Sequence, residues 1–148
     1  MHALNSTSVL TTTRRAALLD AGLLLARLGA AAVFIHHGAQ KLFGAFGGPG
    51  IEGFAGYLTS LKVPMPLLNA WLAGLAEFGG GVALALGLGT RLVGLPLTFT
   101  MAVAFFTAHK GNWSEGELAG FLGLSSLALA LTGAGRLSLD HLIWRARK

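Results

Sequence analysis

Two charged residues lie near the middle of long apolar stretches of this sequence. Arg27 lies in the apolar run that begins after Arg14 and Arg15. Glu77 lies in WLAGLAEFGGGVALALGLG, residues 71–89. An unpaired charge at the centre of a bilayer costs on the order of 3 kcal/mol. Each residue is about ten positions from an end of its expected helix, so both should lie at the same depth. We therefore predict that Arg27 and Glu77 form a buried ion pair.

This charge pair has two interpretations. It either fixes the packing of two helices or takes a direct part in handling protons or a substrate. Gly74 and Gly81 lie on the same helix face as Glu77, and such small residues allow a neighbouring helix to approach closely. The sequence leaves both roles open.

A second polar cluster is expected at one end of the same helices. The first apolar run ends in FIHHGAQKLFG, which contains His37 and Lys41, and a later run ends in FFTAHKGNW, which contains His109. On a helical wheel, His37 and Lys41 fall within about 80° of Arg27, whereas His36 falls on the opposite side. We predict that His37, Lys41 and His109 line a polar pocket between the helices, with the charge pair as its floor. His36 should face the lipid headgroups.

Each of these residues also has an ordinary explanation. A lysine near a helix end often extends to the membrane surface, and a terminal histidine is commonly solvated. Two histidines near Glu115 and Glu117 could also suggest a metal site. However, no HxxxH or HxxE spacing occurs within one helix, and the lysine opposes cation binding, so no metal site is predicted.

Other familiar catalytic motifs are missing from the sequence. The chain contains no cysteine, which excludes disulfides, thiolate nucleophiles and sulfur-ligated metals. It also lacks a Walker loop, a dinucleotide-binding glycine motif and a nucleophile elbow. No covalently bound cofactor is therefore expected.

The composition is that of a membrane protein. Of the 148 residues, 53% are hydrophobic and 11% are charged, and the mean hydropathy is +0.65. A soluble domain carries about 25% charged residues. The net charge of +5 comes mainly from lysines and arginines in short flanks around the apolar runs. That distribution indicates membrane topology rather than binding of nucleic acid.

Apolar segments that can cross a membrane core need about 20 helical residues. The sequence contains such segments at residues 17–38, 66–88, 92–110 and 117–134. We predict an all-α fold, an antiparallel bundle of four transmembrane helices that forms one domain over residues 16–143.

The segments outside these helices differ in character. Residues 1–15 are polar and rich in Ser and Thr, which predicts a disordered tail, and residues 144–148 form a basic C-terminal tail. Residues 51–61, IEGFAGYLTSL, form either a short amphipathic helix at the membrane interface or an ordered loop. The helix would place these apolar residues on one side: Ile51, Phe54, Tyr57, Leu58 and Leu61.

The positive charges predict the orientation. With the N-terminus in the cytoplasm, that side collects Arg14, Arg15, Arg91, Arg136, Arg145, Arg147 and Lys148, and the other side has Lys41, Lys62 and Lys110. The excess predicts that both termini are cytoplasmic. The twin arginine also suggests an export signal, but Asp20 and Arg27 interrupt the apolar run after it, so a first membrane helix is preferred.

The order and spacing of several segments resemble the DoxX family of small bacterial four-helix membrane proteins. The resemblance covers roughly residues 20–143. The segments are Arg27 in the first helix, HGAQKLFG (37–44), LAEFGGGVALALGLGTR (75–91), MAVAFFTAH (101–109) and GAGRLSLD (133–140).

This resemblance implies a redox-linked role. The family takes its name from a subunit of an archaeal thiosulfate:quinone oxidoreductase, and other members are linked to oxidative-stress defence and to quinone or catechol detoxification. It implies a multi-pass protein of the bacterial inner membrane, with a quinone as its candidate diffusible cofactor and a soluble redox enzyme as its candidate partner. It leaves open whether the chain is itself catalytic, as a membrane subunit of a quinone-linked oxidoreductase.

Two alternatives remain open at the level of sequence. The chain could be a non-enzymatic scaffold that docks a soluble oxidoreductase through the basic C-terminal segment RLSLDHLIWRARK. It could also be a small transporter that uses Arg27 and Glu77 as a coupling site, although no inverted repeat or pair of broken helices supports this. The sequence does not decide whether the chain forms a homo-oligomer.

Overall fold

The computed structural model describes residues 6–147, and its regular elements are all helical. The predicted all-α class is confirmed. The elements in chain order are α1 (Ser6–Phe43), the short 3-10 turn η1 (Ala45–Gly47), α2 (Gly50–Ser60), α3 (Pro66–Leu86), α4 (Thr90–Thr107), α5 (Trp113–Thr132) and α6 (Leu139–Ala146).

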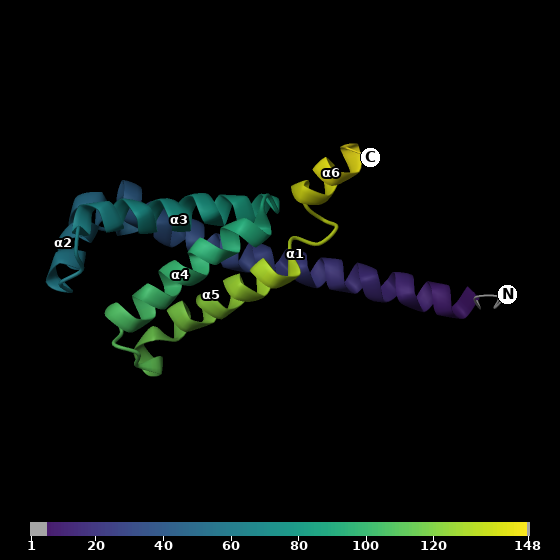
Figure 1. The fold of residues 1–148 in the computed structure, drawn as a ribbon, viewed down its shortest axis with the longest axis horizontal. Coiled ribbons are helices and arrows are strands. Elements are labelled where there is room, and N and C mark those ends of the chain that lie inside the picture. The colour runs from purple at the N-terminus through teal and green to yellow at the C-terminus, as the bar shows by residue number, and fades with distance from the viewer. Residues whose placement is uncertain (1–5, 148) are drawn as a thin grey trace.

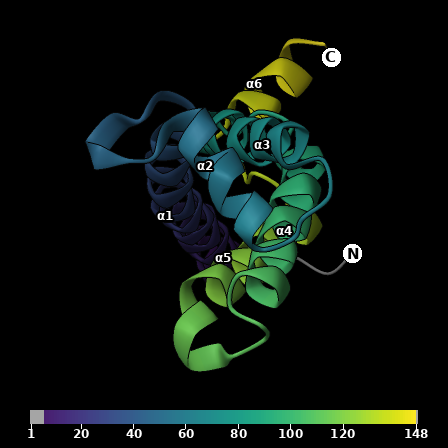
Figure 2. The same cartoon turned by 90° about the vertical axis from the view of Figure 1, so that its left-hand side faces the viewer.

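The long helices form two antiparallel pairs. α1 packs along α3, and α4 packs along α5 (Figure 1). α3 and α4 meet near the turn that joins them and then diverge (Figure 1). At the far end from this turn, α2 crosses over α1 and α3 (Figure 2). We call the end with the α3–α4 turn and α6 the basal end, and the end covered by α2 the pocket end.

Glycines set the register between α1 and α3. A Cβ on Gly38 would overlap the backbone of Phe78, and one on Gly81 would lie 2.9 Å from the backbone nitrogen of Ile35. These close approaches bring the two helix backbones together, as small residues do in membrane proteins. They also place Arg27 level with the C-terminal end of α3, near Gly87.

The ends of the helices follow ordinary capping rules. α3 begins with Pro66, which the first turn of a helix tolerates, and ends at Gly87 in the left-handed conformation (φ +66°). The side chain of Asn112 caps α5 by accepting a hydrogen bond from the backbone N–H of Ser114 at 3.1 Å. Pro96 lies inside α4, in the second turn of a helix that begins at Thr90.

Three helices within residues 6–147 are long and apolar enough to cross a membrane. They cover Thr11–Phe43, Pro66–Leu86 and Thr90–Thr107, and correspond to the first three predicted segments. α5 has 20 residues, but its N-terminal part carries the exposed, charged residues Glu115 and Glu117. A fourth crossing by α5 stays a prediction.

The structure corrects the expected tails. α1 begins at Ser6, so residues 6–15, predicted to be disordered, are helical, and residues 1–5 lie outside the described part. The C-terminal segment was predicted only as a basic tail, but α6 extends to Ala146. For residues 51–61, α2 confirms the helical alternative over nearly the whole segment.

Candidate functional site

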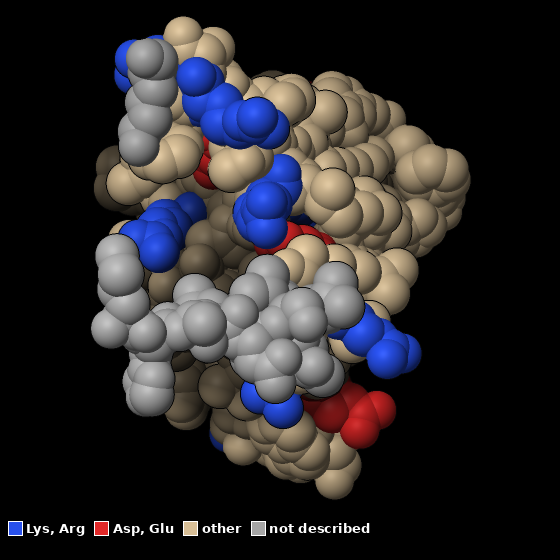
Figure 3. All heavy atoms as spheres, turned by 90° about the vertical axis from the view of Figure 1, so that its right-hand side faces the viewer, with Lys and Arg blue, Asp and Glu red and all other residues tan. Residues whose placement is uncertain are grey.

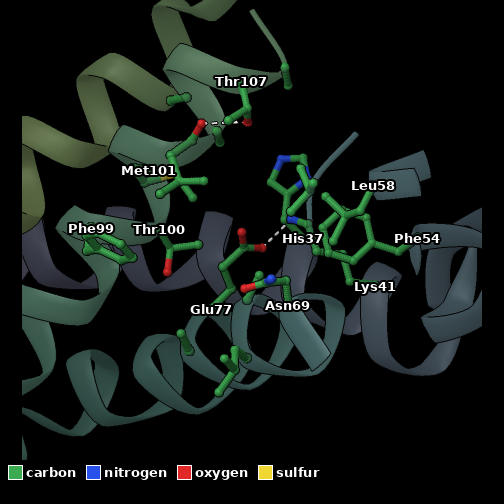
Figure 4. A pocket seen from close by; sticks show the side chains of 18 of the residues that line it. His37, Lys41, Phe54, Leu58, Asn69, Glu77, Phe99, Thr100, Met101 and Thr107 are labelled. Atoms are coloured by element: carbon green, nitrogen blue, oxygen red, sulfur yellow. Dashed lines mark hydrogen bonds and ion pairs between the residues drawn. The ribbon is translucent and has the colours of Figure 1, made fainter. Parts of the chain in front are cut away.

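A cavity of about 710 Å³ lies between the helices at the pocket end. Every helix from α1 to α5 contributes to its wall, and most of the wall is aliphatic or aromatic (Figure 4). Its polar side chains include His37, Lys41, Asn69, Glu77, Thr100 and His109.

An ion pair between Lys41 and Glu77 forms one side of this cavity. The ammonium of Lys41, on the last turn of α1, binds the carboxylate Oε2 of Glu77 in the middle of α3 (Figure 4). The side chain of Glu77 is 3% exposed and that of Lys41 is 20% exposed. The Lys41 Nζ also lies 5.3 Å from the ring centroid of Phe54, in cation–π geometry. Glu77 is therefore neutralised inside the protein, whereas Lys41 keeps partial access to the cavity.

The predicted ion pair between Arg27 and Glu77 is wrong. Arg27 is 1% exposed and donates its hydrogen bonds to backbone carbonyls. Its Nε binds the oxygen of Leu84 at 3.0 Å, and its Nη2 binds that of Leu137 at 3.0 Å. Its Nη1 binds the carbonyl of Ala134. Arg27 thus joins α1 to the end of α3 and to the segment that precedes α6.

The error comes from the register of α1. Equal distances from the predicted helix ends suggested equal depth, but α1 extends well beyond the predicted segment in both directions. The glycine contacts with α3 place Arg27 opposite Leu84, which follows Glu77 by about two helical turns, or ~10 Å. The floor of the pocket is therefore the pair of Lys41 and Glu77, without Arg27.

Two carboxylates bind chain segments next to those that Arg27 binds. Asp20 on α1 accepts a hydrogen bond from the backbone N–H of Arg136 at 2.8 Å. Asp140, in the first turn of α6, accepts hydrogen bonds from the backbone N–H groups of Gly89 at 2.8 Å and Thr90 at 3.3 Å, where α4 begins. We call Asp20, Arg27 and Asp140, together with the backbone groups they bind, the basal clasp.

The structure brings together the three residues that were predicted to line the pocket. His37, Lys41 and His109 all border the same cavity. His37 and His109 are half-buried, and His109 packs beside Gly116 of α5, where an added Cβ would lie 3.0 Å from the histidine Cβ. Binding of a ligand by these residues stays a prediction.

His36 lies on the other side of α1. Its side chain is exposed and stacks on Phe46, with the ring centroids 4.8 Å apart. This placement agrees with the helical wheel, which turned His36 away from the face shared by His37 and Lys41.

Sequence reasoning missed several contributors to the cavity. Asn69 and Thr100 were not singled out because an isolated polar residue in an apolar helix gives no spacing signal. Lys41 was placed in the pocket but not paired with Glu77. A weak signal for that pair existed, because Gly38 and Gly74 each lie three residues before one of the two charges, and both are sites of close approach.

The described residues offer no preformed metal site. Within residues 6–147, no group of three His, Asp or Glu side chains lies close enough together to hold a metal ion. The site is instead suited to hydrogen bonding, because it combines an ammonium, two carboxylates and two imidazoles within largely apolar walls.

The sequence is similar to several known proteins. The model of the DoxX family matches residues 22–110. The inner membrane protein YphA of Escherichia coli (strain K12) is 31% identical over 133 residues, which cover 80% of this chain and 88% of that protein. No solved structure matches.

Two further relatives cover similar shares. The putative oxidoreductase CatD of Bacillus subtilis (strain 168) is 31% identical over 134 residues, or 87% of this chain and 92% of that protein. The inner membrane protein YqjF of Escherichia coli (strain K12) is 35% identical over 134 residues, or 84% of this chain and 93% of that protein.

Proposed function

This chain belongs to the DoxX family and is a multi-pass protein of the bacterial inner membrane, and from that premise we propose that its pocket binds a planar, weakly polar molecule such as a quinone. The observation that carries this proposal is the ion pair of Lys41 and Glu77 on the wall of a largely apolar cavity of about 710 Å³. Cavities of this size and character, with a few placed polar groups, are typical of small-molecule sites.

The chemistry of the wall supports such a ligand. A lysine ammonium has three N–H donors, and Glu77 takes one of those of Lys41, so others remain for a carbonyl oxygen. His37 and His109 add further groups that donate or accept hydrogen bonds and can exchange protons near neutral pH. Phe54 and Tyr57, whose rings lie 6.5 Å apart, offer flat apolar surface.

A separate observation supports a redox role for this protein. One relative bears the name of a putative oxidoreductase. This chain contains no cysteine, so electrons would be carried by the bound molecule or by a partner protein. We propose that the chain is the membrane component of a quinone-linked or detoxifying system, and that it presents the ligand rather than an electron-transfer centre of its own.

The proposal includes a topology of four crossings. α5 is the fourth crossing, residues 16–143 form the membrane domain, and the pocket end faces the outside. Exposed positive side chains at the basal end support a cytoplasmic location for it, and Figure 3 shows them spread over this face. They are Arg14, Arg15, Arg91, Arg136, Arg145 and Arg147.

Reporter fusions test this topology. A reporter after Lys148 should give a cytoplasmic signal, and reporters inserted near Pro49 or Asn112 should give an external one, because the positive charges favour the cytoplasmic side. An external signal from the C-terminal fusion would contradict the orientation.

Ligand titration tests the pocket itself. We expect benzoquinone, naphthoquinone or catechol probes to raise the thermal stability of the wild type in nanodiscs at micromolar concentrations. The double variant Lys41→Gln/Glu77→Gln should weaken this effect while retaining a neutral hydrogen-bonding pair, and His109→Ala should also weaken it. His36→Ala is the matched control, because His36 is exposed outside the cavity. If no quinone, catechol or small sulfur oxyanion stabilises the wild type, the proposal is wrong.

α6 supports a second candidate function, that of a docking subunit. Its Leu142, Ile143 and Trp144 are exposed, Arg145 lies beside them, and α6 packs little against the other helices. A soluble oxidoreductase that bound here would be captured by the full chain and lost when residues 139–148 are removed. The transporter alternative loses its proposed coupling site, because Arg27 and Glu77 are not paired.

A further inference from the structure

The cavity has an opening within the membrane-spanning helices. Leu72 of α3 is 56% exposed and Phe99 of α4 is 71% exposed, and both side chains also line the cavity. Both belong to helices long and apolar enough to cross a membrane. This opening therefore faces hydrocarbon rather than water.

The opening results from the way α3 and α4 diverge. Near their turn the helices touch, since a Cβ on Gly80 would lie 3.0 Å from the side chain of Leu97. Leu97 is fully buried and closes the gap at this level. Toward the pocket end, the small residues Ala73 and Ala76 of α3 and Thr100 of α4 line the cavity among larger side chains of both helices. These small side chains leave space between the two helices, and the exposed Leu72 and Phe99 border it.

The gap leads directly to the ion pair. Ala76 lies next to Glu77 in the sequence, and both line the cavity. Figure 4 shows Thr100 and Phe99 of α4 on one side of the cavity and Lys41 and Glu77 on the other. A molecule dissolved in the bilayer can therefore reach these polar groups without crossing the aqueous phase.

The charges of the site select what enters. Lys41 and Glu77 neutralise each other, so at this pair an anion would compete with Glu77 for Lys41, and a cation would face the ammonium. Glu115, the other carboxylate of the lining, lies at the N-terminal end of α5 and is exposed. A neutral head with a carbonyl oxygen can accept a hydrogen bond from Lys41 while the pair stays intact. An apolar tail can remain in the lipid between α3 and α4.

We infer that the pocket takes a neutral, lipid-soluble ligand that enters sideways from the bilayer through the gap between α3 and α4 and leaves its tail in that gap. This inference rests on the proposed function, because it specifies the ligand class and the entry route of the same cavity. The proposed function does not itself require entry from the bilayer, since a water-soluble molecule could also reach the cavity at the pocket end, where Glu115 is exposed.

The experiment compares two probes with the same benzoquinone head, one with a decyl tail and one without a tail. Both are titrated against the protein in nanodiscs by thermal stability. Ala76→Phe and Thr100→Phe fill the gap from α3 and from α4. Leu75→Phe and Leu95→Phe are the matched controls, because both leucines are exposed on the same helices but do not line the cavity.

We expect both gap variants to weaken binding of the tailed probe by about tenfold or more and to change binding of the tailless probe by less than about twofold. The control variants should bind both probes as the wild type does. Retained binding of the tailless probe also shows that the gap variants are folded, because a misfolded protein would lose both probes.

Several outcomes would overturn the inference. If the gap variants bind the tailed probe as tightly as the wild type, the sideways route is wrong and the proposed function stands. The same holds if they lose both probes equally while keeping the circular dichroism spectrum and the thermal midpoint of the wild type without ligand. If a photoreactive phosphatidylcholine labels the gap and the tailed probe does not displace it, the gap holds a lipid acyl chain alone. If neither probe binds the wild type, the inference and the proposed function both fail.

Discussion

At the basal end Arg27 binds backbone carbonyls, whereas at the pocket end Lys41 binds the side chain of Glu77. The carboxylates of the basal clasp likewise bind backbone N–H groups, and Asp20 also lies 3.8 Å from the exposed side-chain Nε of Arg136. No lining residue of the cavity belongs to this clasp. This contrast determines which charges are available to a ligand. A charge bound to backbone holds chain segments together, while a charge that meets another side chain beside a cavity keeps donors for an incoming molecule.

The largest expected effect comes from Arg27→Met. The variant removes all three hydrogen bonds of the buried Arg27 and leaves the carbonyls of Ala134 and Leu137 without this donor, while that of Leu84 keeps the N–H of Gly87. We expect the free energy of unfolding to fall by on the order of 3 kcal/mol. Chemical unfolding in detergent micelles measures this loss. Protein that remains folded should still bind the quinone probes. Unchanged stability would show that the basal clasp does not hold these segments together.

A double-mutant cycle on Lys41 and Glu77 should give the next largest effect. Glu77→Leu leaves Lys41 unpaired, but this lysine has partial access to the cavity, so we expect a loss of about 2 kcal/mol. Lys41→Met in the same chain should recover about half of it. Arg27→Met and Glu77→Leu should instead add within about 0.5 kcal/mol, because the residues share no partner. Strong coupling between Arg27 and Glu77 would contradict the structure.

A smaller effect is expected from Asp140→Ala. The substitution removes the acceptor for the N–H groups of Gly89 and Thr90 at the start of α4, and loss of such a cap costs about 1 kcal/mol. Thermal unfolding measures the loss of stability, with Glu117→Ala as the control variant because Glu117 is an exposed carboxylate at the pocket end. Equal midpoints for the two variants would show that Asp140 does not cap α4.

The smallest effect is expected from His36→Ala. This exposed histidine stacks on Phe46 and meets the ring of His37 edge-on, but it does not line the cavity. Stability should therefore change by less than about 0.5 kcal/mol, and binding of the quinone probes should not change. His37→Ala, one residue along the helix, should weaken binding because His37 lines the cavity. Similar binding by both variants would show that the cavity is not the binding site.

The residues that line the pocket could be predicted because they lie near helix ends. His37, Lys41 and His109 come together because their helix ends lie at the same end of the bundle. The alternation of apolar segments and turns determines which helix ends these are. The helical wheel then separated His37 from His36, since rotation around one helix is fixed by the sequence spacing.

The partners of the buried charges could not be predicted, because they depend on how far one helix slides along another. That register is set by contacts of Gly38 and Gly81 with the facing backbone, and such contacts do not follow from the sequence alone. α6 was missed for another reason. It is short and polar enough to resemble a tail, and its start depends on the cap from Ser138, whose hydroxyl accepts from the N–H of His141 at 3.2 Å.

The partners of Arg27 have a consequence for the order in which the chain is made. α1 leaves the ribosome first, yet two of the three carbonyls that satisfy its arginine belong to Ala134 and Leu137, after the last long helix. Until that segment is synthesised, Arg27 has Leu84 as its one available acceptor among these three. The arginine of the first helix thus obtains all three hydrogen bonds only after the segment that follows α5 has been synthesised. A chain that stopped at Thr132 would retain every long helix but lack two of these hydrogen bonds.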